Sequence, residues 1–222
     1  IDNDLAATSV TFGFHTAVQI ASAAIGRLHS TAEAHRRVMV VEVMGRDAGW
    51  IALFAGLAGT ADIILIPEIP YRLEEICEKV ESRFHDEDGF AIVVVAEGAR
   101  PRDGDPVFEE ENPATGMPRY GGIAERLAEQ IAEATGRESR SLVLGHLQRG
   151  GEPVAYDKIL ALRFGAAAVD LVAQGKFGSM VALDPPKVLA VPLEEATSEM
   201  KLVPLDGDVM KTARSLGVSF GD

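Results

Sequence analysis

Two aspartates lie at the start of the sequence, on either side of an asparagine. Asp2 and Asp4 are close enough to divide the work near a phosphoryl-transfer centre. One would accept a proton from an attacking hydroxyl, and the other would shape the metal or phosphate environment. The same composition also favours turns and helix N-termini, so helix capping is the alternative role for both side chains.

A glycine and an arginine follow the apolar run 38–43, which has the length of a strand. Gly45 would let the backbone approach a ligand closely, and Arg46 would supply a fixed positive charge beside it. A phosphate suits this pair. An arginine directly after a strand is commonly a solvated surface charge instead, so these two residues alone leave both interpretations open.

The segment 144–151, L-G-H-L-Q-R-G-G, is a second candidate for anion binding. His146 and Arg149 can both donate hydrogen bonds to a phosphate, and the flanking glycines permit close approach of the backbone. Glu97 follows the apolar run 90–96, where it could accept hydrogen bonds from sugar hydroxyls or form a salt bridge. Both segments follow expected strands, at the edge where open α/β sheets bind ligands.

Apolar stretches of strand length alternate with stretches of helical periodicity along the chain. This alternation predicts parallel pairing and a layered α/β/α architecture. The composition of residues 100–118 predicts an exposed excursion, and four prolines after residue 183 predict an irregular tail that ends in a final helix. The expected strands are 38–43, 61–66, 90–96, 141–144 and 176–183, and the expected helices are 11–28, 48–57, 73–84, 121–135, 155–173 and 206–216.

The composition is that of an ordinary soluble globular protein. The chain has 222 residues, of which 47% are hydrophobic and 25% are charged. Its formal net charge of -13 argues against binding nucleic acid or an anionic membrane surface, although clustered arginines could still hold a small anion. The single cysteine, Cys77, cannot form an internal disulfide, and no apolar run reaches the roughly 18 residues of a membrane helix. We therefore expect a cytoplasmic protein.

Five sequence motifs together resemble the 6-phosphofructokinase family, of the A-like type that uses ATP or pyrophosphate. In chain order they are I-D-N-D at 1–4, T-F-G-F-H-T-A at 11–17, V-E-V-M-G-R at 41–46, A-E-G at 96–98 and L-G-H-L-Q-R-G-G at 144–151. The resemblance covers nearly the whole chain and is weak after residue 183. It implies a two-domain α/β fold whose nucleotide half is incomplete. Residues 1–13 would be a remnant of the nucleotide-side domain, 14–147 the fructose 6-phosphate-binding domain, and 148–222 the return to the nucleotide side with the C-terminal helix.

The resemblance implies phosphoryl transfer to the 1-hydroxyl of fructose 6-phosphate, a step of glycolysis. Asp2 would be the base, with Asp4 close by, and Arg46 would stabilise charge near the transferred group. Met44 and Gly45 would lie against the sugar. Glu97 would accept hydrogen bonds from sugar hydroxyls, and His146 and Arg149 would bind the 6-phosphate. Arg37 and Arg140 would reach the 6-phosphate that is bound in a neighbouring subunit. The active site would then be shared within a homo-oligomer, a dimer or tetramer.

The sequence lacks several segments that the family carries upstream of I-D-N-D. These are the glycine-rich phosphate loop, the Gly-Gly-Asp segment with the Mg²⁺ ligand, and the threonine before the motif. We therefore expect the magnesium ligand outside this chain, leave the donor open between ATP and pyrophosphate, and expect the 222 residues alone to be inactive. The excursion 100–118 is longer than in the short, allosteric bacterial type of the family, which favours the broader group that includes members using pyrophosphate as the donor. The family includes allosteric enzymes, but His29 and the acidic turn 85–88 lack the cations of the effector site in the short bacterial type.

A non-catalytic alternative also fits the motifs. Duplicated members of the family contain a regulatory half that binds a sugar phosphate without turning it over. Asp2 favours the catalytic interpretation, because a chain that only binds an effector has no use for a proton acceptor at that place.

Overall fold

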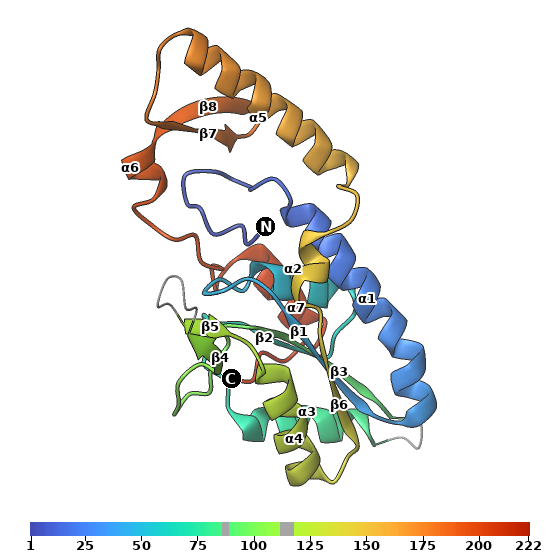
Figure 1. Cartoon of the computed structure of the whole chain (residues 1–222). Coiled ribbons are helices and arrows are strands. Elements are labelled where there is room, and N and C mark those ends of the chain that lie inside the picture. Colours follow the sequence, from blue (N-terminus) through green and yellow to red (C-terminus); the bar gives the residue numbers. More distant parts are fainter. Residues whose placement is uncertain (86–88, 112–117) are drawn as a thin grey trace.

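A four-stranded parallel sheet forms the centre of the molecule. The computed structural model describes residues 1–85, 89–111 and 118–222 (Figure 1). The strand order is β2-β3-β1-β6, and β1 pairs in parallel with both β3 and β6. The predicted α/β fold with a mostly parallel sheet is confirmed. The strands are β1 (Val38–Val43), β2 (Ile63–Leu65), β3 (Ala91–Ala96) and β6 (Ser139–Val143).

Helices cover both faces of this sheet because its inner strands β1 and β3 are buried on both sides. Met39, Val41 and Val43 of β1 belong to a core shared with the first group of helices, whereas Val38 and Val40 belong to a core shared with the second. This alternation follows from the period of two in a strand. The first group is α1 (Phe14–His35), α2 (Trp50–Ala58) and α7 (Asp208–Ser215), and the second is α3 (Leu73–Arg83) and α4 (Ile123–Thr135) (Figure 1).

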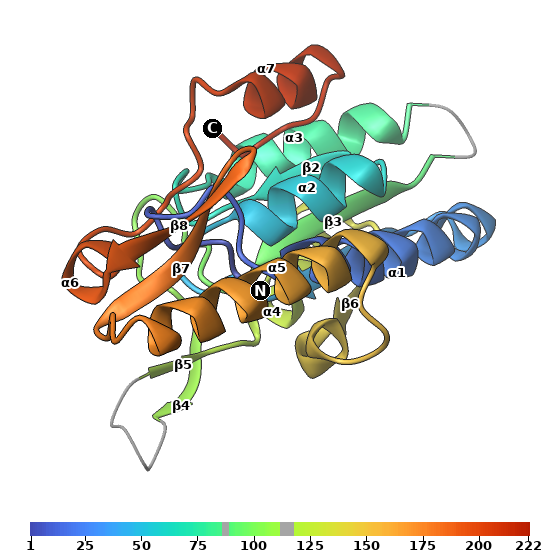
Figure 2. The same ribbon diagram turned by 90° about the horizontal axis from the view of Figure 1, so that it is seen from above.

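A smaller group of elements lies beyond the sheet. The short 3₁₀ helix η1 (Gly145–Arg149) follows β6 and leads to α5 (Ala155–Ala173). The antiparallel pair β7 (Ser179–Asp184) and β8 (Lys187–Pro192) packs against α5, as Figure 2 shows, and α6 (Leu193–Ala196) follows. None of the described helices is both long and apolar enough to cross a membrane.

Three of the described strands lie where the sequence predicts none. The tail after residue 183 forms β8, because Pro185 and Pro186 occupy the turn and Pro192 ends the strand, so none of them interrupts the ladder. The expected excursion contains the antiparallel pair β4 (Phe108–Glu111) and β5 (Pro118–Tyr120). Within the segments interpreted from sequence, residues 86–88 and 112–117 lie outside the described residues, as do the side chains of the acidic run 109–111.

The last residues return to the sheet. Ser219 forms a parallel bridge with Ile63 at the β2 edge, and Phe220 is fully buried in the same core as α1 and α2. Leu160 and Phe164 of α5 contribute to that core as well. This core therefore contains residues from both sides of position 147.

Candidate active site

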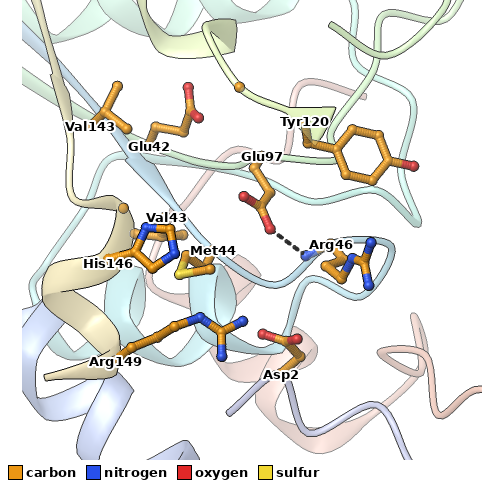
Figure 3. A pocket seen from close by; sticks show the side chains of 12 residues that line it. Asp2, Glu42, Val43, Met44, Arg46, Glu97, Tyr120, Val143, His146 and Arg149 are labelled. Atoms are coloured by element: carbon orange, nitrogen blue, oxygen red, sulfur yellow. Dashed lines mark hydrogen bonds between the residues drawn. The ribbon is translucent and has the colours of Figure 1, made fainter. Parts of the chain in front are cut away.

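A cavity of about 260 Å³ opens at the carboxyl edge of the sheet. Because β1, β3 and β6 are parallel, the residues that follow each of them meet at this edge. Six of the ten side chains proposed from sequence line the cavity (Figure 3). They are Asp2, Met44, Arg46, Glu97, His146 and Arg149.

The loop after β1 presents Arg46 to the cavity in an unusual backbone conformation. Gly45 has φ 140° and Arg46 has φ 50°, both in the left-handed region. The carboxylate oxygen Oε1 of Glu97 accepts hydrogen bonds from the backbone N–H groups of Gly45 (3.3 Å) and Arg46 (3.0 Å). Gly98 lies so close to this loop that a Cβ there would be 2.0 Å from the carbonyl oxygen of Arg46. The A-E-G segment therefore fixes the conformation of the arginine loop.

Glu97 has a perturbed carboxyl group. Burial raises its pKa above the ordinary value, and the two backbone N–H donors of the loop oppose this shift. The charge of Asp2 raises the pKa further, and that of Arg46 lowers it. Glu97 thus combines a structural contact with a position on the cavity wall.

Asp2 is the carboxylate best placed to accept a proton. Its oxygen Oδ1 is buried and accepts no hydrogen bond from any residue that the structure describes. Burial raises the pKa of Asp2, and the charge of Asp4 raises it further, while Arg149 and Arg46 lower it. Figure 3 shows Asp2 on the same side of the cavity as both arginines. An unpartnered carboxylate oxygen beside two cations suits a general base near an anionic substrate.

The 3₁₀ helix η1 places a second cationic group at the cavity. His146 and Arg149 are three residues apart, so the 3₁₀ repeat puts them on the same side of the helix, and both are exposed. Gln148 is buried between the two strand ends. Its Oε1 accepts from the backbone N–H of Met44 (3.3 Å), and its Nε2 donates to the carbonyl of Gly145 (3.1 Å). Sequence reasoning missed Gln148, whose amide joins the two motifs.

Three of the residues proposed from sequence lie away from this cavity. Arg37 and Arg140 both form ion pairs with Glu138, at 3.2 and 2.7 Å, beside the amino ends of β1 and β6. This is the edge of the sheet opposite the cavity. Asp4 lines a neighbouring cavity of about 400 Å³, to which Asp2 also contributes.

Tyr120 is a cavity residue that sequence reasoning missed. It comes from β5, so no strand of the parallel sheet points to it. Its hydroxyl donates to Asp47 Oδ1 at 2.5 Å. Burial, with that bond and the charge of Asp47, raises the pKa of Tyr120 to about 12. The Tyr120–Asp47 contact links the hairpin to the arginine loop.

Glu42 is the one charged residue in β1, and it is 3% exposed. Its Oε2 accepts a hydrogen bond from the backbone N–H of Ala124 at 3.0 Å, at the start of α4. A carboxylate is favourable there because the helix N-terminus carries partial positive charge. Within residues 1–85, 89–111 and 118–222, no group of three or more His, Cys, Asp or Glu side chains is arranged to hold a metal ion.

The chain matches known proteins over its whole length. The family model described as phosphofructokinase matches residues 1–172. The ATP-dependent 6-phosphofructokinase of Chloroflexus aurantiacus is 54% identical over 222 residues, which are 100% of this chain and 61% of that protein. The pyrophosphate–fructose 6-phosphate 1-phosphotransferase of Amycolatopsis methanolica is 59% identical over 206 residues, covering 92% of this chain and 60% of that protein.

Solved structures agree with these sequence matches. A pyrophosphate-dependent phosphofructokinase from Marinobacter aquaeolei superposes with a TM-score of 0.77 at 28% identity, over 98% of this chain and 58% of that one. Phosphofructokinase from Saccharomyces cerevisiae gives a TM-score of 0.74 at 35% identity, over 89% of this chain and 25% of that one. The chain spans about 61% of the length of the first curated relatives that it matches. It belongs to the phosphofructokinase family.

Proposed function

We propose that the protein containing this chain transfers a phosphoryl group to the 1-hydroxyl of fructose 6-phosphate, giving fructose 1,6-bisphosphate in glycolysis. The observation that carries the proposal is the cavity in which the unpartnered carboxylate of Asp2 lies near Arg46 and Arg149. The names of the relatives support it, since they are phosphofructokinases that use ATP or pyrophosphate.

In this mechanism Asp2 accepts the proton of the 1-hydroxyl as its oxygen attacks the transferred phosphoryl group. Its raised pKa makes it a better proton acceptor than a solvated aspartate, while the charges of the nearby arginines oppose this shift. Arg46 compensates the negative charge near the transferred group, and the Glu97 contact to its backbone holds the loop ready before the reaction. Asp4 adjusts the proton affinity of Asp2.

Substrate binding uses the other cavity residues. Glu97 would accept hydrogen bonds from sugar hydroxyls, and Met44 and Gly45 would lie against the sugar ring. His146 and Arg149 would hold the 6-phosphate from η1, where glycines on both sides leave the backbone accessible.

Arg37 and Arg140 lie at the opposite edge of the sheet from the cavity of their own chain. We propose that they complete the 6-phosphate site of a neighbouring subunit. The enzyme would then be a homo-oligomer, a dimer or tetramer with shared active sites.

We further propose that the phosphoryl donor, ATP or pyrophosphate, is bound largely by parts of the protein outside this chain. The described residues offer no cluster of three or more His, Cys, Asp or Glu side chains for Mg²⁺, and we propose that its ligand lies in those other parts as well. The isolated chain should accordingly bind fructose 6-phosphate without turning it over. We place the enzyme in the cytoplasm.

The test is to titrate the full-length protein with fructose 6-phosphate and Mg²⁺, offering ATP and pyrophosphate separately. Turnover with one donor identifies it. Asp2→Asn should then lower kcat by about two orders of magnitude or more, the scale expected for losing a general base. Asp206→Asn, at an exposed site in the tail, is the matched control. Binding of fructose 6-phosphate without turnover from either donor would instead favour the non-catalytic regulatory half.

A further inference from the structure

The ammonium group of Lys201 is held against the segment that carries Asp2. This half-buried lysine donates three hydrogen bonds, to Asn3 Oδ1 (3.0 Å) and to the backbone carbonyl oxygens of Thr8 (2.9 Å) and Ser9 (3.0 Å). A lysine ammonium has three donors, so these contacts satisfy all of them. Burial lowers the pKa of Lys201 to about 8, which still leaves the group mostly protonated at pH 7. The contacts are therefore charge-assisted hydrogen bonds.

The bonded segment has a backbone conformation that needs support. Asn3 is buried and has φ 58°, and its Oδ1 also accepts from the backbone N–H of Thr11 (3.1 Å). A left-handed residue other than glycine costs about 1–3 kcal/mol and persists only where its surroundings hold it. The backbone N–H of Lys201 donates to the carbonyl of Asp4 at 2.7 Å. Lys201 thus holds Asn3 and Asp4, which directly follow Asp2, together with Thr8 and Ser9.

The same part of the tail also holds the beginning of α2, close after the arginine loop. The carbonyl of Lys201 accepts from Trp50 Nε1 at 2.7 Å. Two residues on, the N–H of Val203 donates to Glu68 Oε1 (2.8 Å), an oxygen that also accepts from the N–H of Gly49 (3.0 Å). Residues 200–203, here called the tail strap, therefore contact the segment that carries the proposed base and, through Trp50 and Glu68, the start of α2 that follows the arginine loop.

The tail strap is remote in sequence from both segments. An antiparallel bridge joins Leu5 to Met200, and the chain after α6 runs close to the first residues in Figure 1. The strap also lies outside residues 1–172, which the family model matches. Its contacts are thus a feature of the tertiary structure that the motifs do not contain.

We propose that Lys201 is a positioning residue of the phosphoryl transfer, acting through the segment 3–9 to hold the Asp2 carboxylate in line with the attacking hydroxyl. The proposal rests on the function proposed above. Lys201 does not itself touch the cavity, so its loss should affect kcat rather than the binding of fructose 6-phosphate to His146 and Arg149.

The experiment compares three variants of the full-length protein with wild type, using the donor that supports turnover. Lys201→Met keeps an unbranched side chain that is one atom shorter and removes its donors, and Lys201→Arg keeps a cation. Lys211→Met, at an exposed site on α7, is the matched control. kcat, the KM for fructose 6-phosphate and its Kd by calorimetry are measured below the melting temperature of every variant.

Lys201→Met should lower kcat about 100-fold, the scale expected for misplacing a reacting group by roughly 1 Å, with KM and Kd within threefold of wild type. Lys201→Arg should recover part of that loss, and Lys211→Met should match wild type. Unchanged kcat in folded Lys201→Met, or a rise in KM and Kd alone, would overturn the role of Lys201. Absence of wild-type turnover with either donor would overturn the proposed function, and with it this role.

A second variant covers the case in which Lys201→Met does not fold. Trp50→Phe keeps an aromatic ring at this site and removes the indole N–H that donates to the carbonyl of Lys201, together with the five-membered ring that carries it. It should give a smaller fall in kcat at unchanged Kd for fructose 6-phosphate. Wild-type kcat in this variant would count against the tail strap as a positioning element.

Discussion

Replacing Gly98 by alanine tests whether the arginine loop must keep the conformation seen here. The added Cβ would lie 2.0 Å from the carbonyl oxygen and 2.9 Å from the carbonyl carbon of Arg46. Both atoms belong to the backbone, so no rotamer change relieves the contact. To reach even the 3.0 Å below which real Cβ atoms are essentially never found, the loop has to move by about 1 Å.

A movement of this size would separate Arg46 from its place in the cavity and weaken its backbone hydrogen bond to Glu97. We expect kcat of the full-length enzyme to fall about 100-fold, because displacements near 1 Å in a reacting site cost about that much. The overpacking should also lower the free energy of unfolding by about 1–3 kcal/mol. The assay is the initial rate of fructose 1,6-bisphosphate formation, with a thermal melt of each variant beside it.

Gly26→Ala is the matched control for this substitution. Gly26 lies on α1, and nothing approaches within 4 Å of the Cβ that alanine would add. Alanine there should leave kcat unchanged and stabilise the helix by about 0.5–1 kcal/mol. A folded Gly98→Ala enzyme with kcat within threefold of wild type would refute the reasoning that Gly98 is needed to fix the loop.

Three further predictions concern Asp2 and its surroundings. Asp4→Asn removes a negative charge that raises the pKa of Asp2, so the acid limb of the kcat/KM profile should move to lower pH; a shift to higher pH would contradict this. The pKa of Asp2 is raised from 3.8 in the folded state, so the folded state loses stability relative to the unfolded state as the pH rises from 3.8 through the folded-state pKa. Asp2→Asn removes this loss, so it should raise Tm at pH 7 relative to wild type but not below pH 3.8. If Arg140 serves a neighbouring subunit, an oligomer that mixes Asp2→Asn and Arg140→Ala subunits contains some intact active sites. Dissociating the two variants and reassociating them together should therefore restore activity that neither variant has alone. Verified mixed oligomers that recover no activity would argue against shared sites.

The sequence by itself determined the parallel sheet and most of the cavity. β1 and β3 could be predicted nearly to the residue, because strands buried on both faces are almost entirely apolar, with Glu42 the exception in β1, and are bounded where that run stops. The groups that follow such strands meet at one edge in any parallel sheet, which is why Arg46, Glu97 and His146 could be assigned to a common site.

Local signals were less informative where two strands pair through a turn. The expected excursion holds a hairpin, and its Tyr120 reaches the cavity only because β5 lies across the arginine loop. α1 begins at Phe14 and continues to His35, past the expected end at residue 28, because Ala32 still packs into the core after the regular apolar stripe has ended. Packing decided these boundaries, which periodicity left open.

Only the tertiary structure decided how the site is held in place. Gln148, Glu68 and Lys201 are polar residues to which the motifs assign no role, and each bonds to backbone groups of a segment far away in the chain. Such contacts depend on where the chain returns in space, about which sequence spacing carries no information. The residue types of the candidate site are therefore visible in the sequence, whereas the contacts that orient them come from long-range packing and from the need to satisfy buried polar groups.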